Sequence, residues 1–117
     1  MKLLYLLSLL LLAGYQPVAR AHAVVTDYSL KIAPIHANQA DKVSLNFNSK
    51  IELGLSQIFL VSKGDKQTLL SIAKGNKQGQ ISIDIPPLVP GDYALKLKVF
   101  AADGHLTEDV IHFSVAP

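Results

Sequence analysis

The residues of this chain that could bind a metal are histidines and carboxylates. The 117 residues include four histidines and nine acidic residues, but no cysteine and one methionine, the initiator. A metal site built from the rest of the chain therefore uses nitrogen and oxygen ligands, without a thiolate or a thioether. Two places are candidates: His22, and the tripeptide Asp103-Gly104-His105.

The first 21 residues have the organisation of a secretory signal peptide. Lys2 precedes an apolar, leucine-rich run of about a dozen residues, and Ala19 and Ala21 form a small-x-small cleavage site. A membrane-spanning helix needs about 20 apolar residues, and Gly14–Arg20 cannot extend the run. We therefore expect export with cleavage after Ala21 and a mature domain over residues 22–117; a retained membrane anchor is the alternative.

Cleavage after Ala21 would give His22 the free α-amino group of the domain. Its amine and its ring Nδ1 could then chelate one metal ion, since both groups give up their protons to a metal near neutral pH. Asp103 and His105 would add a carboxylate and a second imidazole, and Gly104 lets their loop fold closely. Three nitrogens and one oxygen suit the tetragonal geometry of Cu(II). The competing interpretations are an accidental first residue and an ordinary Asp-Gly turn.

The charge of the chain gives little indication of a partner. The formal net charge is +2, but two basic residues, Lys2 and Arg20, belong to the predicted signal peptide, and residues 22–117 are neutral. These residues contain no basic cluster of the kind that binds nucleic acid, so we expect no nucleic-acid partner. Without cysteine, the domain must be held by its hydrophobic core alone.

Apolar and polar residues alternate through most of residues 22–117, which is typical of half-buried strands. The predicted strands are 23–32, 43–48, 57–62, 67–73, 81–85, 93–100 and 111–115. About seven short strands separated by turns predict an all-β, immunoglobulin-like sandwich. In this arrangement Asp103 and His105 lie on the loop between the last two strands.

Five motifs, in order along the chain, resemble those of CopC-type periplasmic copper-binding (copper resistance) proteins. They are His22-Ala23, Val43-Ser44-Leu45-Asn46-Phe47-Asn48, Leu88-Val89-Pro90-Gly91-Asp92-Tyr93, Ala102-Asp103-Gly104-His105 and Phe113-Ser114-Val115. The resemblance implies a Greek-key β-sandwich that binds one Cu(II) per chain through the amine and ring of His22, Asp103 and His105. It also implies a periplasmic role in copper homeostasis, beside a CopD-type membrane copper transporter.

The chain departs from the family pattern in three respects. Tyr28–Ala33 replaces a proline-rich stretch, so the first strand is expected to run differently, and Leu97 replaces the usual tryptophan. Because no sulfur follows Met1, the methionine-rich Cu(I) site of some members cannot form. We therefore expect a monomeric binding protein with a single Cu(II) site, and no enzymatic activity.

Other residues and other functions are alternatives to this interpretation. His36 and His112 are expected to be exposed and not to bind metal, and Asp27 or Glu108 could orient a ligating imidazole. The alternative functions are a metal-free interaction module and a histidine-brace copper monooxygenase. A monooxygenase needs an open coordination position on the copper ion. Asp103 would occupy that position, which disfavours this alternative.

Overall fold

The computed structural model describes residues 23–31 and 33–117, so the predicted signal peptide and His22 lie outside the described residues. The described part of the chain forms eight β-strands and one turn of 3-10 helix, η1. The elements are β1 Val25–Tyr28, η1 Ser29–Lys31, β2 Asp41–Phe47, β3 Gln57–Ser62, β4 Lys66–Leu69, β5 Ile72–Lys74, β6 Gln80–Ile85, β7 Gly91–Phe100 and β8 Leu106–Val115. No helix within this part of the chain is long and apolar enough to cross a membrane.

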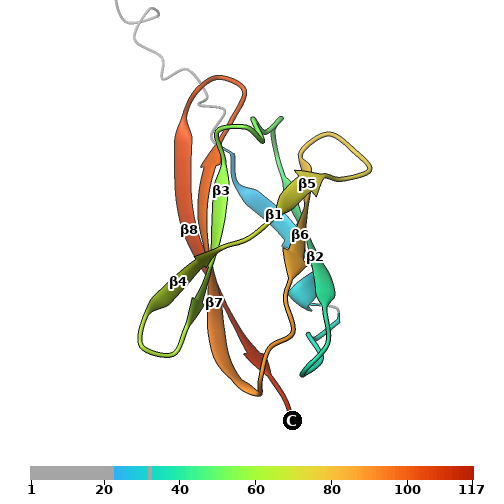
Figure 1. Cartoon of the computed structure of the whole chain (residues 1–117). Coiled ribbons are helices and arrows are strands. Elements are labelled where there is room, and N and C mark those ends of the chain that lie inside the picture. The colour runs from blue at the N-terminus through green and yellow to red at the C-terminus, as the bar shows by residue number, and fades with distance from the viewer. Residues whose placement is uncertain (1–22, 32) are drawn as a thin grey trace, which may run out of the picture.

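The strands form two four-stranded antiparallel sheets that pack face to face (Figure 1). The strand order is β1-β2-β6-β5 in one sheet and β4-β3-β7-β8 in the other. The chain changes sheet after β2, β4 and β6, so the central pairs β2–β6 and β3–β7 join strands that are distant in sequence. This architecture confirms the predicted all-β sandwich.

The core lies between the two sheets and is built by the alternation seen in the sequence. Alternate side chains in residues 43–47 of β2, 81–85 of β6 and 95–99 of β7 are buried in the core. These side chains are Val43, Leu45, Phe47, Ile81, Ile83, Ile85, Leu95, Leu97 and Val99. Burying one such side chain stabilises the fold by about 1.5–3 kcal/mol. Leu97, which stands where a tryptophan was expected from the family pattern, is 1% exposed and part of this core.

The predicted strand 67–73 is divided between the two sheets, which gives eight strands in place of about seven. Leu70 N–H still donates to Ile58 O on β3 at 2.9 Å, whereas Ser71 O accepts from Asp84 N–H on β6 at 3.0 Å. The chain therefore crosses between these two residues, where the side chain of Leu70 is buried in the core. An alternating pattern does not reveal such a crossing, because both sheets present their apolar side chains to the same core.

The predicted first strand, 23–32, is shorter than expected. β1 ends at Tyr28 and the chain turns into η1. Ser29 Oγ accepts the backbone N–H of Ser44 at 3.0 Å. After β1 ends, this side chain therefore provides the hydrogen-bond acceptor for β2 in place of a strand backbone. The departure of Tyr28–Ala33 from the family pattern thus coincides with a local departure from the strand.

Candidate metal centre

Asp103 and His105 lie on a tight loop between β7 and β8. Gly104 N–H donates to Ala101 O at 2.9 Å, and Ala101 N–H donates to His105 O at 3.0 Å, which closes the loop. Gly104 has a φ of +89°, a conformation that residues with a Cβ rarely adopt. The Asp-Gly pair therefore forms the turn that the sequence indicates, with a carboxylate before the glycine and an imidazole after it.

The Asp103 carboxylate holds His105 at two points. Its Oδ1 accepts the backbone N–H of His105 at 3.1 Å, and its Oδ2 lies 2.9 Å from His105 Nδ1. Both side chains remain accessible, with 53% of His105 and 35% of Asp103 exposed to solvent. A carboxylate and an imidazole are thus paired on an accessible loop, where an ion could reach them.

The connection between β2 and β3, residues 48–56, contacts the beginning of this loop and the end of β7. Lys50 O accepts the N–H of Ala102 at 2.9 Å, and Ile51 forms an isolated bridge with Ala101. Ser56, which is buried, donates its hydroxyl to Glu52 O at 2.8 Å and accepts the N–H of Phe100 at 3.0 Å. Hydrogen bonds from this segment therefore continue from the end of β7 to Ala102, the residue before Asp103.

The same segment also holds the beginning of the described chain. Val24 N–H donates to Asn48 Oδ1 at 2.9 Å, and Asn48 N–H donates to Val24 O at 3.1 Å. Ala23, the residue that follows His22 in the sequence, is fully buried. Asn48 and Lys50 are two residues apart, so the residues after His22 and the residue before Asp103 are fastened to neighbouring positions (Figure 1).

The structure describes two of the three residues proposed as ligands, and His22 lies outside it. Among the described residues, no group of three or more histidine, aspartate or glutamate side chains could hold a metal ion. Of the three proposed ligands, the two that the structure describes, Asp103 and His105, are brought together at this loop. The sequence did not indicate the roles of Ser56, which bonds Phe100 at the end of β7, or of Asn48, which was expected only as the last residue of the strand 43–48 and bonds Val24, because single polar contacts leave no periodic pattern.

The remaining histidines lie elsewhere on the surface. His36 is exposed, is 3.8 Å from the carboxylate of Asp41, and bridges to Ala116. His112 is an exposed residue of β8, paired with Ala94 and out of phase with the buried Ile111, as the alternation predicts.

The two residues considered as orienting groups are both exposed on strands. Asp27 pairs with Asn46, and Glu108 pairs with Lys98. Within the described part of the chain, the carboxylate that contacts an imidazole on the loop is that of Asp103.

Fold and loop together define a small β-sandwich domain with a candidate nitrogen and oxygen metal site at one end. A model of the CopC domain matches residues 29–116, and the chain belongs to the CopC family. The match includes Asp103 and His105 and begins after β1. No curated protein matches the chain.

Several solved structures are similar to this protein over most of the chain. CopC from Methylosinus trichosporium OB3b is 27% identical, with a TM-score of 0.67, and the alignment covers 82% of this chain and 95% of that chain. PcoC from Escherichia coli, described as a methionine rich copper resistance protein, is 23% identical with a TM-score of 0.62, covering 82% and 100%. A superoxide reductase (neelaredoxin) from Ignicoccus hospitalis is 13% identical with a TM-score of 0.52, covering 89% and 90%, and shares the fold alone.

Proposed function

We propose that this protein is an exported copper-binding protein that holds one Cu(II) per chain through His22, Asp103 and His105. The observation that carries the proposal is the contact of 2.9 Å between Asp103 Oδ2 and His105 Nδ1 on an accessible loop. Membership of the CopC family supports it, as does the likeness to a protein described as a copper resistance protein.

The chemistry of the available donors fits Cu(II). Asp103 offers a carboxylate oxygen and His105 an imidazole nitrogen, and a free amine and ring at His22 would complete a tetragonal set of nitrogen and oxygen ligands. Residues 22–117 contain no sulfur, which excludes a thioether site for Cu(I). In this respect the chain differs from the relative described as methionine rich.

Asp103 orients His105 before an ion arrives. Its two oxygens hold the backbone and the ring of His105, so part of the ordering that binding requires is already present in the loop. Val24 and Ala102 are fastened to Asn48 and Lys50, and this brings the residues next to the proposed ligands to one end of the sandwich. The supported loop preorganises the site, and its exposure allows the ion to be exchanged.

The role that follows is carriage of copper, not catalysis. Signal cleavage after Ala21 would deliver the domain to the periplasm and free the amine of His22. There the monomer would sequester Cu(II) or pass it to a CopD-type membrane transporter. An accessible site suits such transfer, because a receiving ligand can approach Asp103 and His105 from solvent.

A copper titration tests the proposal. We compare the chain beginning at His22 with one carrying Gly-Ser-Gly-Ser before His22, and follow Cu(II) by electron paramagnetic resonance. The extension moves the amine away from the ring, so binding is expected to weaken by at least about tenfold to a hundredfold. His105→Ala should weaken it comparably, whereas His112→Ala, an exposed histidine on a strand, is the matched control.

Two outcomes would contradict the proposal. Equal binding by the extended and unextended chains would remove the amine from the site and direct attention to His36 and His112. No binding by either chain would leave a metal-free sandwich that acts as an interaction module.

A further inference from the structure

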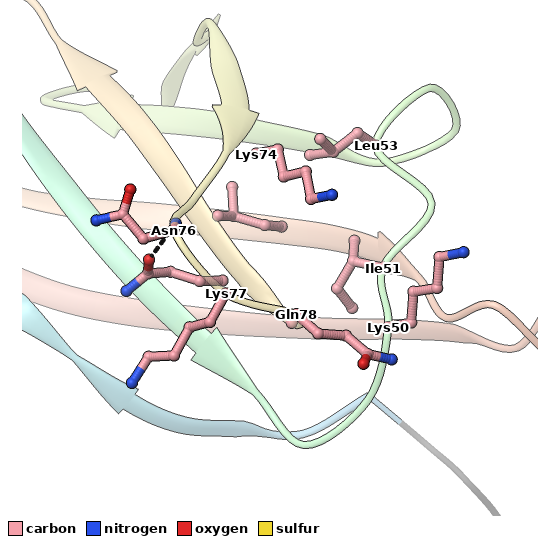
Figure 2. A pocket seen from close by; sticks show the side chains of 10 residues that line it. Lys50, Ile51, Leu53, Lys74, Asn76, Lys77 and Gln78 are labelled. Carbon is pink, nitrogen blue, oxygen red and sulfur yellow. Dashed lines mark hydrogen bonds between the residues drawn. The ribbon is translucent and has the colours of Figure 1, made fainter.

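A cleft of about 430 Å³ lies between residues 50–53 and the connection from β5 to β6 (Figure 2). It is next to the loop that carries Asp103 and His105. Its volume is within the range of pockets that hold small molecules. The residues that line it are Lys50, Ile51, Leu53, Lys74, Asn76, Lys77, Gln78, Gly79, Gln80 and Ile81. The carbonyl of Lys50 accepts the N–H of Ala102, so the backbone segment that lines the cleft also contacts the loop that carries Asp103 and His105.

The cleft is strongly basic, although the formal net charge of residues 22–117 is zero. Three of the nine lysines in residues 22–117 line it, and no aspartate or glutamate does. Glu52 lies between two lining residues in the sequence but is not one of them. None of the three lysines forms an ion pair with another of the described residues. This concentration of positive charge attracts an anion.

The connection that forms one wall is fixed by hydrogen bonds. Asn76 N–H donates to Gln80 Oε1 at 2.7 Å, and Gly75 N–H donates to Gln80 O at 2.8 Å. Since Gln80 Oε1 is the acceptor, the other end of this side-chain amide is a donor. Figure 2 shows Lys74 and Lys50 on either side of Ile51, with Lys77 further out along the connection. The cationic and amide donors thus come from two separate parts of the chain.

An apolar floor limits the kind of anion that fits. Ile51, Leu53 and Ile81 line the cleft between the lysines and amides. A carbon chain would cover these side chains while its carboxylates reach the lysines. Inorganic anions and flat acidic surfaces would leave this apolar hollow unfilled.

We propose that the cleft binds a small organic polycarboxylate anion. This second ligand goes beyond the proposed copper function and is independent of it. The carboxylates contact Lys50, Lys74 and the amide donors, and the hydrocarbon part packs on Ile51. Lys77 adds to the attraction from the outer end of the connection.

Calorimetric titration of the metal-free protein, produced from the full chain, with propane-1,2,3-tricarboxylate tests this inference. We expect saturable binding that weakens from low to physiological ionic strength. The double variant Lys50→Gln, Lys74→Gln should weaken it by about three- to tenfold. The matched control is Lys63→Gln, Lys66→Gln, which removes the same charge from the turn after β3 and from the first residue of β4. Because no copper is present, the result does not depend on the proposed metal site.

Four outcomes would overturn the inference. The first is an absence of saturable binding, and the second is an equal loss of affinity in the two double variants, which would indicate unspecific attraction. The third is tighter binding of a capped tri-glutamate peptide than of the tricarboxylate, which would assign the cleft to an acidic segment of a protein partner. Stronger binding of inorganic phosphate would equally contradict a role for the apolar floor.

Discussion

Gly79→Ala should destabilise the domain far more than an ordinary substitution at a loop glycine. Gly79 is buried at the end of the connection before β6 and has a φ of +81°. A Cβ at this position would lie 2.6 Å from Phe47 O and 3.0 Å from Ser49 O, both backbone atoms. The backbone carbonyl of Gly79 also accepts the N–H of Phe47 at 2.8 Å. The glycine thus allows two backbone segments to approach closely at the end of the sandwich that carries the site.

The cost can be separated into two parts. A positive φ costs a residue with a Cβ about 1–2 kcal/mol. Moving Phe47 away from the new methyl group disturbs a buried side chain and a hydrogen bond, which adds about 1–3 kcal/mol. The total is about 2–5 kcal/mol, or roughly 10–30 °C in Tm for a domain of this size.

Urea denaturation followed by circular dichroism measures this loss, and Gly64→Ala is the matched control. Gly64 has a φ of +79°, but a methyl group added there would have no neighbouring atom within 4 Å, so its substitution carries the conformational cost alone. The difference between the two variants therefore measures the steric cost of the approach to Phe47. Equal destabilisation by the two substitutions would refute the reasoning.

Two further predictions concern the support of the loop and the metal. Ser56→Ala removes the acceptor of Phe100 N–H and should cost about 1–3 kcal/mol in the free energy of unfolding; in the same urea assay Ser62→Ala, whose hydroxyl makes an exposed contact of 3.4 Å, should cost less than about 0.5 kcal/mol. Acidification should release Cu(II), because protons compete for the amine, the imidazoles and finally the carboxylate; paramagnetic resonance signals unchanged at about pH 3 would contradict the ligand set.

The strands could be predicted from the sequence where their alternation is regular, but not their assignment to sheets. The inward residues of β2, β6 and β7 followed directly from a period of two. The division of residues 67–73 did not, because Leu70 contributes to the core in either arrangement and only its hydrogen bonds show the crossing. The early end of β1 depends on the Ser29 hydroxyl bonding to Ser44, a contact between residues 15 positions apart.

The part of the candidate site that is local in sequence could also be predicted. Asp103 and His105 are two residues apart on a glycine turn, so their contact follows from the tripeptide itself. Their support could not be predicted, since it consists of single polar contacts across the fold, from Lys50 to Ala102 and from Ser56 to Phe100. The basic cleft also depends on distant residues, because Lys50 and Lys74 line one cleft only when β6 pairs with both β2 and β5.

Lys50 contributes to the loop that carries Asp103 and His105, and to the basic cleft, through different groups. Its backbone carbonyl holds Ala102, while its side chain is part of the lining of the cleft. A substitution that changes the side chain alone therefore removes a charge from the cleft and keeps the hydrogen bond to the loop. Changes at Gly79 or Ser56 instead disturb the backbone segments on which both sites rest. Copper binding and anion binding should thus be separable at Lys50 and both weakened at Gly79, as expected if the connection from β2 to β3, against which Gly79 packs, supports the two proposed ligand sites.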